Sequence, residues 1–298
     1  MMSRADIHVH TRYSGVGKLG PLRFPESISD PKDVVKKAHS MGFRVVCITD
    51  HNSIEGALIA KENAKSYKDI DVVVGEEITS VDGEIIGLFL SEEIPSGLSI
   101  EETIRRIREQ GGLVIAPHPF SLHCPALGSR ISELDIDGIE ILNAGHIDGY
   151  ANNKASEWSD QRLWANLGGS DSHTLSTIGD AYTLFEGETA EDLRRSILKK
   201  STDVRGGAWR LEKAIHWSIG VVLTSDVLLL KSMLGLIREA DMHDPIVSKI
   251  RVMKTGKKVL ALMGSILYLL PPIPFLCGIT GKQFLKRKAR IQQTERKR

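Results

Sequence analysis

Residues 6–11 of the chain read Asp6-Ile7-His8-Val9-His10-Thr11. The apolar residues Ile7 and Val9 alternate with histidines, which is the period of a β-strand. Residues two apart on a strand point to the same side, so the imidazoles of His8 and His10 can both reach one ion. This stretch therefore predicts a first strand whose end carries metal chemistry.

Similar short apolar runs recur along the first 200 residues, with helical patterns between most of them. Strands are predicted at 6–9, 44–49, 71–74, 84–90, 113–116, 138–142, 165–169 and 181–185. Helices are predicted at 31–40, at 99–110 and at 190–200, each with start signals such as Pro31 after Asp30. Alternating strands and helices predict an α/β fold with a parallel sheet, either closed as a barrel or open.

The pattern changes after about Gly207. Residues 211–237 are long, apolar and helical in character, and residues 259–280 contain no charge. The second segment is long enough to cross a bilayer, but Pro271, Pro272 and Pro274 interrupt it. We therefore expect two regions, a 1–210 barrel and a 211–298 helical extension. Whether residues 259–280 span a membrane, dip into it as a hairpin or pack as a buried helix pair is left open.

Charge is distributed unevenly. The net charge is +1, yet residues 249–298 carry +12 and residues 1–248 carry −11. An acidic body is a poor ligand for phosphate backbones, so long nucleic acid is an unlikely partner, whereas the basic tail is suited to an anionic membrane surface. The scattered cysteines Cys47, Cys124 and Cys277 predict a reducing compartment and argue against a thiolate zinc site. No export signal is visible, so we expect a cytoplasmic protein at the cytoplasmic face of a membrane.

Histidines and carboxylates follow five of the predicted strands. They are His8 and His10, Asp50 and His51, Glu76 and Glu77, His118, and Asp171 and His173. In an α/β barrel the carboxyl ends of the strands converge on the face that carries the active site. Imidazoles and carboxylates without thiolates suit zinc, manganese or iron, and the number of ligands predicts several ions.

The order of these segments resembles the PHP (polymerase and histidinol phosphatase) superfamily over about residues 4–210. The motifs are His8-x-His10-Thr11, Ile48-Thr49-Asp50-His51, Gly75-x-Glu77-x-Thr79, Pro117-His118-Pro119 and Ser170-Asp171-x-His173. The resemblance implies a distorted seven-stranded TIM-like barrel with two or three divalent ions that hydrolyse phosphate esters. It also implies that the eight predicted strands include one outside the barrel.

The resemblance also assigns ligands. By it, His8, His10, Glu77 and Asp171 hold the first metal, and Glu77 bridges two ions. His118 helps to hold the second metal, while His51 and His173 hold the third.

Two departures remove one expected ligand each from the second and third metals. Ser14 is followed by Gly15 where many relatives carry Asp, and Glu84-Ile85-Ile86 stands where many carry Glu-Ile-His. Substitutes are Asp50, Glu76, His123 or His146; otherwise the site holds fewer ions.

Other side chains have alternative roles. Arg12 either faces a substrate phosphate or is a solvated surface residue, and His123 is either a ligand or a proton donor. Asn143 and His146 follow the sixth strand and are candidates for the pocket lining. Cys124 is expected to be a bystander.

The sequence thus predicts a PHP-type phosphoesterase that acts on a phosphorylated small molecule or a nucleotide through a metal-activated water. One alternative is a 5′–3′ exonuclease or 3′,5′-nucleotide phosphodiesterase. The other is a catalytically weak regulatory module that is tethered to a membrane.

Overall fold

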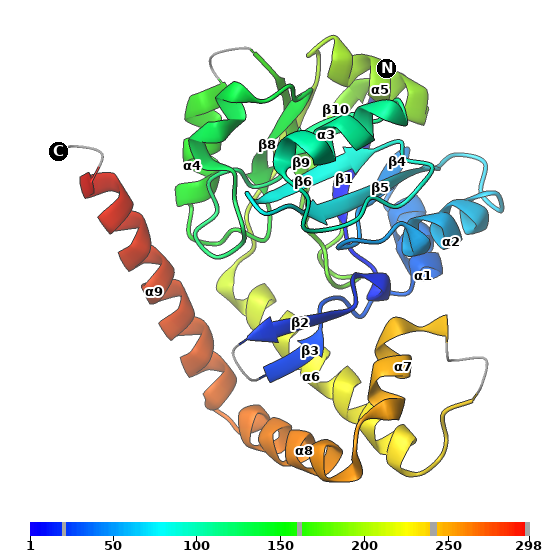
Figure 1. Cartoon of the computed structure of the whole chain (residues 1–298), viewed down its shortest axis with the longest axis vertical. Helices are drawn as coiled ribbons and strands as arrows, with labels where there is room; N and C mark the ends of the chain where they lie inside the picture. The colour runs from blue at the N-terminus through cyan, green and yellow to red at the C-terminus, as the bar shows by residue number, and fades with distance from the viewer. Residues whose placement is uncertain (20–21, 160–162, 239–242, 296–298) are drawn as a thin grey trace.

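The computed structural model describes residues 1–19, 22–159, 163–238 and 243–295. One nine-stranded sheet forms a nearly closed barrel, with helices around it and a helical region after it (Figure 1). The strands of this sheet are β1 (Met2–Val9), β4 (Val45–Ile48), β5 (Asp71–Thr79), β6 (Glu84–Leu88), β7 (Leu113–Ala116), β8 (Gly138–Asn143), β9 (Ala165–Gly169), β10 (Ala181–Glu186) and β11 (Asp203–Gly206). The α/β barrel predicted from the sequence is confirmed, but the expected seven strands are not, because the sheet has nine strands and all eight predicted strands belong to it.

The remaining elements surround or follow the sheet. Helices α1 (Pro31–Ser40), α2 (Glu55–Ala64), α3 (Ile100–Glu109), α4 (Tyr150–Ser159) and α5 (Ala190–Leu198) belong to the barrel region. The short helices η1 (Arg12–Ser14) and η2 (Gly128–Glu133) and a hairpin of β2 (Val16–Leu19) and β3 (Leu22–Pro25) complete it. Strands β2, β3 and β11 and helices α2 and α4 were not predicted.

Strand order is β11-β10-β1-β4-β5-β6-β7-β8-β9, and the barrel nearly closes where β9 lies beside β1 and β10. The expected all-parallel sheet is wrong, because β6 runs antiparallel to β5 and β7, and β10 runs antiparallel to β1. The reason is local. A parallel neighbour needs a crossover of a dozen or more residues, whereas only the tight turn of residues 80–83 joins β5 to β6.

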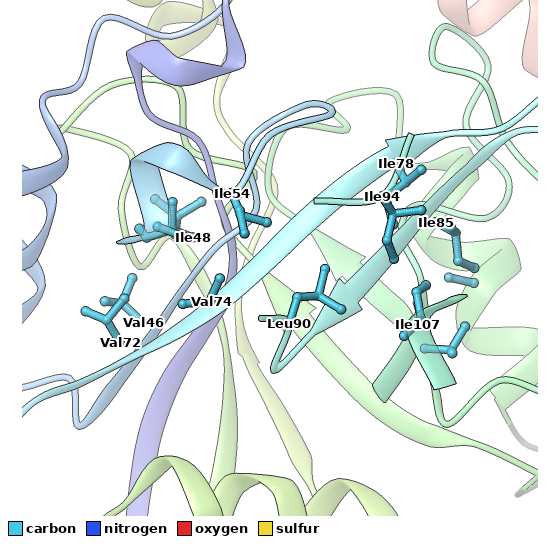
Figure 2. Packing of buried hydrophobic residues seen from close by; sticks show 14 of the residues in the cluster. Val46, Ile48, Ile54, Val72, Val74, Ile78, Ile85, Leu90, Ile94 and Ile107 are labelled. Atoms are coloured by element: carbon cyan, nitrogen blue, oxygen red, sulfur yellow. The ribbon is translucent and has the colours of Figure 1, made fainter. Parts of the chain in front are cut away.

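Two apolar layers hold the barrel together. One lies between strands and helices; in it Val46 and Val72 from the sheet lie near Ile48, and Ile94 and Ile107 lie near Ile85 further along the sheet (Figure 2). The other is made of strand residues such as Ile115, together with residues of α5. Full burial of each such side chain contributes about 1.5–3 kcal/mol.

A register shift in β1 between Asp6 and Val9 determines to which side the side chains of His8 and His10 point. Ala5 and Ile7 belong to the second apolar layer, but Val9 belongs to the first, so the side-chain alternation is interrupted between Ile7 and Val9. His8 and His10 consequently lie on the side opposite Val9. Bulges of this kind often re-aim side chains beside active sites.

The helical region consists of α6 (Leu211–Met233), α7 (Pro245–Val252), α8 (Thr255–Leu269) and α9 (Ile273–Glu295). In Figure 1, α6, α7 and α8 lie below the barrel and α9 rises along its side. The helix predicted at 211–237 ends at Met233, and residues 259–280 are divided between α8 and α9. The proline-containing break bends this pair by 81°.

By length and composition α6 is able to cross a membrane, and α8 with α9 meets the same criterion only as one bent pair. Burial within the chain accounts for only 17% of the apolar window of α6. Such helices are weak evidence for a membrane, and the 210/211 boundary stays a prediction.

Candidate metal centre

All seven side chains that the sequence nominates as metal ligands come from the ends of five strands. They are His8 and His10 at β1, His51 after β4, Glu77 in β5, His118 after β7, and Asp171 and His173 after β9. The side chains of His8, His10, Glu77 and His118 are almost completely buried. The barrel therefore brings together residues that are up to 165 positions apart in the sequence.

The tightest group contains four of these residues. The Nε2 atoms of His8 and His10 are 2.9 Å apart, and each lies 3.3 Å from Glu77 Oε2. Asp171 Oδ1 lies 3.5 Å from His8 Nε2 and 3.2 Å from His10 Nε2. Two ligand atoms at about 2.1 Å from a tetrahedral zinc ion are about 3.4 Å apart. The spacing and chemistry of this donor set fit a divalent metal.

The imidazoles of His8 and His10 are each oriented by a contact to Nδ1, the ring nitrogen that does not face the other ligands. His8 Nδ1 lies 3.2 Å from Glu140 Oε1, and His10 Nδ1 lies 3.0 Å from Ser14 Oγ, which donates to Asp50 Oδ1. Such contacts determine which ring nitrogen is available to the ion and make the ligand more basic. Ser14 thus links His10 to Asp50 and is part of the support for His10.

The backbone around these ligands is constrained. His118 and Asp171 have φ angles of +26° and +49°, a region that residues other than glycine seldom adopt. A β-carbon on Gly169 would lie 2.5 Å from His8 Cβ and 2.6 Å from Glu140 Oε1. Only glycine lets β9 approach the first histidine this closely.

His51 and His173 form a second group around His10. Their ring centroids lie 4.6 Å and 4.3 Å from that of His10, and His51 Nδ1 is 3.2 Å from Glu77 Oε2. Burial and the neighbouring imidazoles lower the pKa of His51 to about 4 and that of His173 to about 3. Both rings are therefore neutral at pH 7, which is the form that binds metals.

A third group lies on the other side of Glu77. His118 Nε2 is 3.0 Å from Glu77 Oε1 and 3.9 Å from Glu84 Oε2. The two oxygens of Glu77 thus face different histidines, as a bridging carboxylate requires. Burial and the charge of Glu77 raise the pKa of Glu84 to about 8.

Opposite charges determine the ionisation of the centre. Burial opposes the charged forms, yet the histidines hold the pKa values of Glu77 and Asp171 well below their usual range. Against the same effect of burial, Glu77 and its neighbours raise the pKa values of His10 and His118 to about 9. The centre is a concentrated set of buried charges that a bound cation would reorganise.

Two of the four substitute ligands point elsewhere. Asp50 accepts hydrogen bonds from the Thr11 N–H and from the hydroxyls of Thr11 and Ser14. Glu76 Oε2 accepts from the Ile94 N–H, and burial raises its pKa to about 8. His123 and His146 lie beside His118, with 4.6 Å between their own ring centroids.

The two residues nominated for catalysis differ in position. Arg12 Nη1 is 2.7 Å from Asp244 Oδ2, so its guanidinium joins the barrel to the turn before α7. The ring of His123 lies 4.6 Å from that of His146, and although the residue is exposed overall, the buried part of its side chain and the charge of His118 lower its pKa.

Sequence reasoning missed several carboxylates of this region. Glu140 is completely buried within Gly138–Asn143, and a charged residue in an otherwise apolar strand was the available signal. Glu84 is the first residue of β6, and its only sequence signal is the Glu84-Ile85-Ile86 run that lacks a histidine. Glu26, just after β3, has its pKa raised by burial and by the charges of Asp171 and Glu77, but nothing in its local sequence marks it.

A cavity of about 460 Å³ adjoins the loop that carries His118. Its wall includes Phe120, Tyr150 and Trp158, while Gln292 of α9 lines another side. Lys288 of α9 also donates to the Leu122 carbonyl oxygen at 3.1 Å. The helical extension thus reaches the loop beside the metal centre.

Comparison with protein families gives two matches. Residues 6–103 match the model of the PHP domain, and residues 149–202 match that of a PHP-associated region. Two proteins of Methanocaldococcus jannaschii are also similar. The uncharacterized protein MJ1587 is 55% identical over 51% of this chain and 88% of its own length. The uncharacterized protein MJ0417 is 31% identical over 67% of this chain and 81% of its own length.

Two solved structures share the fold at low identity. A two-domain protein from Bacteroides vulgatus that contains a predicted PHP-like metal-dependent phosphoesterase superposes with a TM-score of 0.57 and 17% identity. The match covers 70% of this chain and 65% of that one. PsfC from Pseudomonas syringae superposes with a TM-score of 0.53 and 16% identity, over 70% of this chain and 92% of its own.

Proposed function

Since this chain belongs to the PHP superfamily, we propose that it is a metal-dependent hydrolase that cleaves phosphate esters. The observation that carries the proposal is the convergence of His8, His10, Glu77 and Asp171, where each imidazole nitrogen lies 2.9–3.5 Å from the other and from one oxygen of each carboxylate. The additional imidazoles on either side of Glu77 support a centre with more than one ion.

Divalent ions at such a centre activate a water molecule near neutral pH and neutralise the charge of phosphoryl oxygens. The protein supplies the ligands and their orientation. Glu140 and Ser14 hold the rings of His8 and His10, and Glu77 presents one oxygen to each side of the centre. The neutral imidazoles of His51 and His173 extend the ligand set toward the edge.

We propose a small phosphorylated molecule or a nucleotide as the substrate. Residues 1–248, which include the barrel, carry −11, and a long polyanion would be repelled. Exposed His123 lies at the rim beside buried His146, and partial burial and the charge of His118 lower its pKa, so its imidazole is neutral at pH 7 and is suited to a ligand rather than to a proton donor.

Elemental analysis of the purified full chain, paired with hydrolysis of an aryl phosphate monoester and diester, tests this function. We expect two or more ions per chain. His10→Ala and Asp171→Ala should each lose an ion and lower the rate by more than about 100-fold, beyond the loss typical of residues that only orient ligands. His39→Ala, in α1 and against Tyr67, is the matched control and should keep both. Unchanged hydrolysis in both ligand variants would refute the proposal.

We further propose that the helical extension associates with an anionic membrane on the cytoplasmic side. Exposed apolar side chains of α6, α8 and α9 support this, namely Leu223, Val227, Leu230, Leu260, Met263, Ile266, Leu267, Phe275, Leu276 and Ile279. Basic residues flank the bent α8–α9 pair at Lys257 and at Lys282, and each is attracted to anionic lipid by about 1 kcal/mol.

Flotation of the full chain with vesicles tests the membrane proposal. Binding to phosphatidylglycerol vesicles should exceed binding to phosphatidylcholine vesicles and should weaken as salt is raised. A variant with Leu260→Glu, Met263→Glu and Leu267→Glu should float at least about tenfold less, because burying each charge costs about 2 kcal/mol or more. Equal flotation of the variant and the wild type would refute the association through α8.

A further inference from the structure

Three ligand-type side chains other than the seven nominated metal ligands gather beside the metal centre. His123 and Cys124 lie on the loop after β7, and His146 lies after β8. The ligand atoms of these three residues are within 4.8 Å of one another. Cys124 is half-buried, and His146 is completely buried.

The hydrogen bonds of Asn143 determine which nitrogen of His146 carries the proton. The Asn143 amide nitrogen donates to Glu140 Oε2 at 2.9 Å and to Asp171 Oδ2 at 3.1 Å. Its amide oxygen must therefore accept from the Gly145 N–H at 2.8 Å and from His146 Nδ1 at 3.0 Å. With the proton on Nδ1, the Nε2 atom of His146 has a free lone pair.

That lone pair accepts no hydrogen bond from the part of the chain that the structure describes. His146 Nε2 is buried and has no hydrogen-bond partner there. A buried polar atom without a partner costs about 1–3 kcal/mol, so such an atom requires an explanation. Ligand atoms of His123 and Cys124 lie within 4.8 Å of a ring nitrogen of His146, and Nε2 is the nitrogen of that ring that is free to bind an ion.

The cluster is continuous with the centre already described. The ring centroids of His146 and His118 are 5.1 Å apart, and the rings are stacked. Cys124 also lies within 4.8 Å of ligand atoms of Glu84 and His118. The loop after β7 therefore places a thiol beside Glu84 and His118.

We propose that His123, Cys124 and His146 bind a transition-metal ion through two imidazole nitrogens and one thiolate, with Zn²⁺ as the preferred metal. Thiolate and imidazole ligands together favour zinc over magnesium, calcium or manganese. Three protein ligands also leave one coordination position for water or a substrate oxygen. The proposal replaces the bystander role that the sequence predicts for Cys124.

Binding of the metal ion to these three side chains releases one proton. The Cys124 thiol loses its proton to solvent as the metal–sulfur bond forms, and the two neutral imidazoles lose none from their ligand atoms. The participation of this ion in hydrolysis rests on the proposed function, whereas the binding itself does not.

Cobalt substitution tests the site without an activity readout. The full chain, stripped with a chelator, is titrated with Co²⁺, which takes zinc positions and gives a sulfur-to-cobalt charge-transfer band in the near ultraviolet when a thiolate is a ligand. We expect this band in the wild type and in Cys277→Ser, whose exposed cysteine in α9 is the matched control. Cys124→Ser should abolish the band, and His123→Ala and His146→Ala should each weaken Co²⁺ binding at this site at least tenfold.

Four results would overturn the proposed site or the proposed function. No charge-transfer band in the wild type, or a band that survives in Cys124→Ser, overturns the site. A band of unchanged affinity in both His123→Ala and His146→Ala also overturns it, because Cys124 would then act only with Glu84 and His118. His123 is exposed, so its variant is expected to fold even if His146→Ala does not. A chain that shows the band but hydrolyses no phosphate ester would refute the proposed function alone.

Discussion

Replacing Glu77 with glutamine removes one negative charge and keeps the shape of the side chain. Glu77 is 1% exposed and contacts four imidazoles. The shortest contact, 3.0 Å to His118 Nε2, corresponds to an attraction of about 5–6 kcal/mol for a charged ring at an effective dielectric constant of about 20. Desolvation offsets part of this attraction, and removal of one partner from a buried ion pair costs about 3–5 kcal/mol.

We therefore expect Glu77→Gln to lower the free energy of unfolding of chelator-treated protein by about 3–5 kcal/mol at pH 7. Urea denaturation followed by tryptophan fluorescence measures this difference, provided that the slope with denaturant is unchanged. In untreated protein the same variant should hold at least one ion fewer, as elemental analysis would show.

Glu76 is the matched control, because it is the adjacent buried carboxyl on the same strand. Its pKa is raised to about 8, so the group is largely neutral at pH 7 and glutamine preserves its charge. The oxygen of glutamine can still accept from the Ile94 N–H. Glu76→Gln should cost less than about 1 kcal/mol. Equal losses in the two variants would refute the electrostatic reasoning.

Three further predictions concern the metal centre and the Arg12–Asp244 ion pair. In chelator-treated protein the pKa values of His10 and His118 are raised to about 9, so their stabilisation is complete below about pH 6.5 and is lost as the pH rises through 9. Urea unfolding should thus show falling stability across this window, and a rise would contradict the assigned charges. Gly169→Ala should lower metal content and hydrolysis at least tenfold by displacing His8, whereas Gly207→Ala, where a β-carbon meets nothing within 4 Å, should change neither. Arg12→Gln should lower the free energy of unfolding by at most about 1 kcal/mol, because a third of its side chain is exposed, and a loss above about 2 kcal/mol in urea titrations would show that the Asp244 pair is more than a surface contact.

The sequence by itself determined the parts of this protein that depend on local pattern. Strand and helix periodicity predicted eight strands of the sheet, and the position of each histidine after an apolar run predicted that the ligands would meet. Both follow from near-neighbour geometry, because a strand end is visible in the residues that form it. The break of the uncharged C-terminal segment at its prolines was visible for the same reason.

Only the tertiary structure decided the features that depend on distant segments. The antiparallel placement of β6 and β10 follows from which edges pair, and the aim of His8 follows from the bulge in β1. The substitutes for the missing ligands were undecidable from the sequence because Asp50, Glu76 and His146 carry similar local signals. Asp50 accepts a hydrogen bond from Thr11 and Glu76 accepts one from Ile94, whereas His146 donates from Nδ1 to Asn143 and keeps a free Nε2. Such partners come from other elements, so their effect exists only once the barrel has closed.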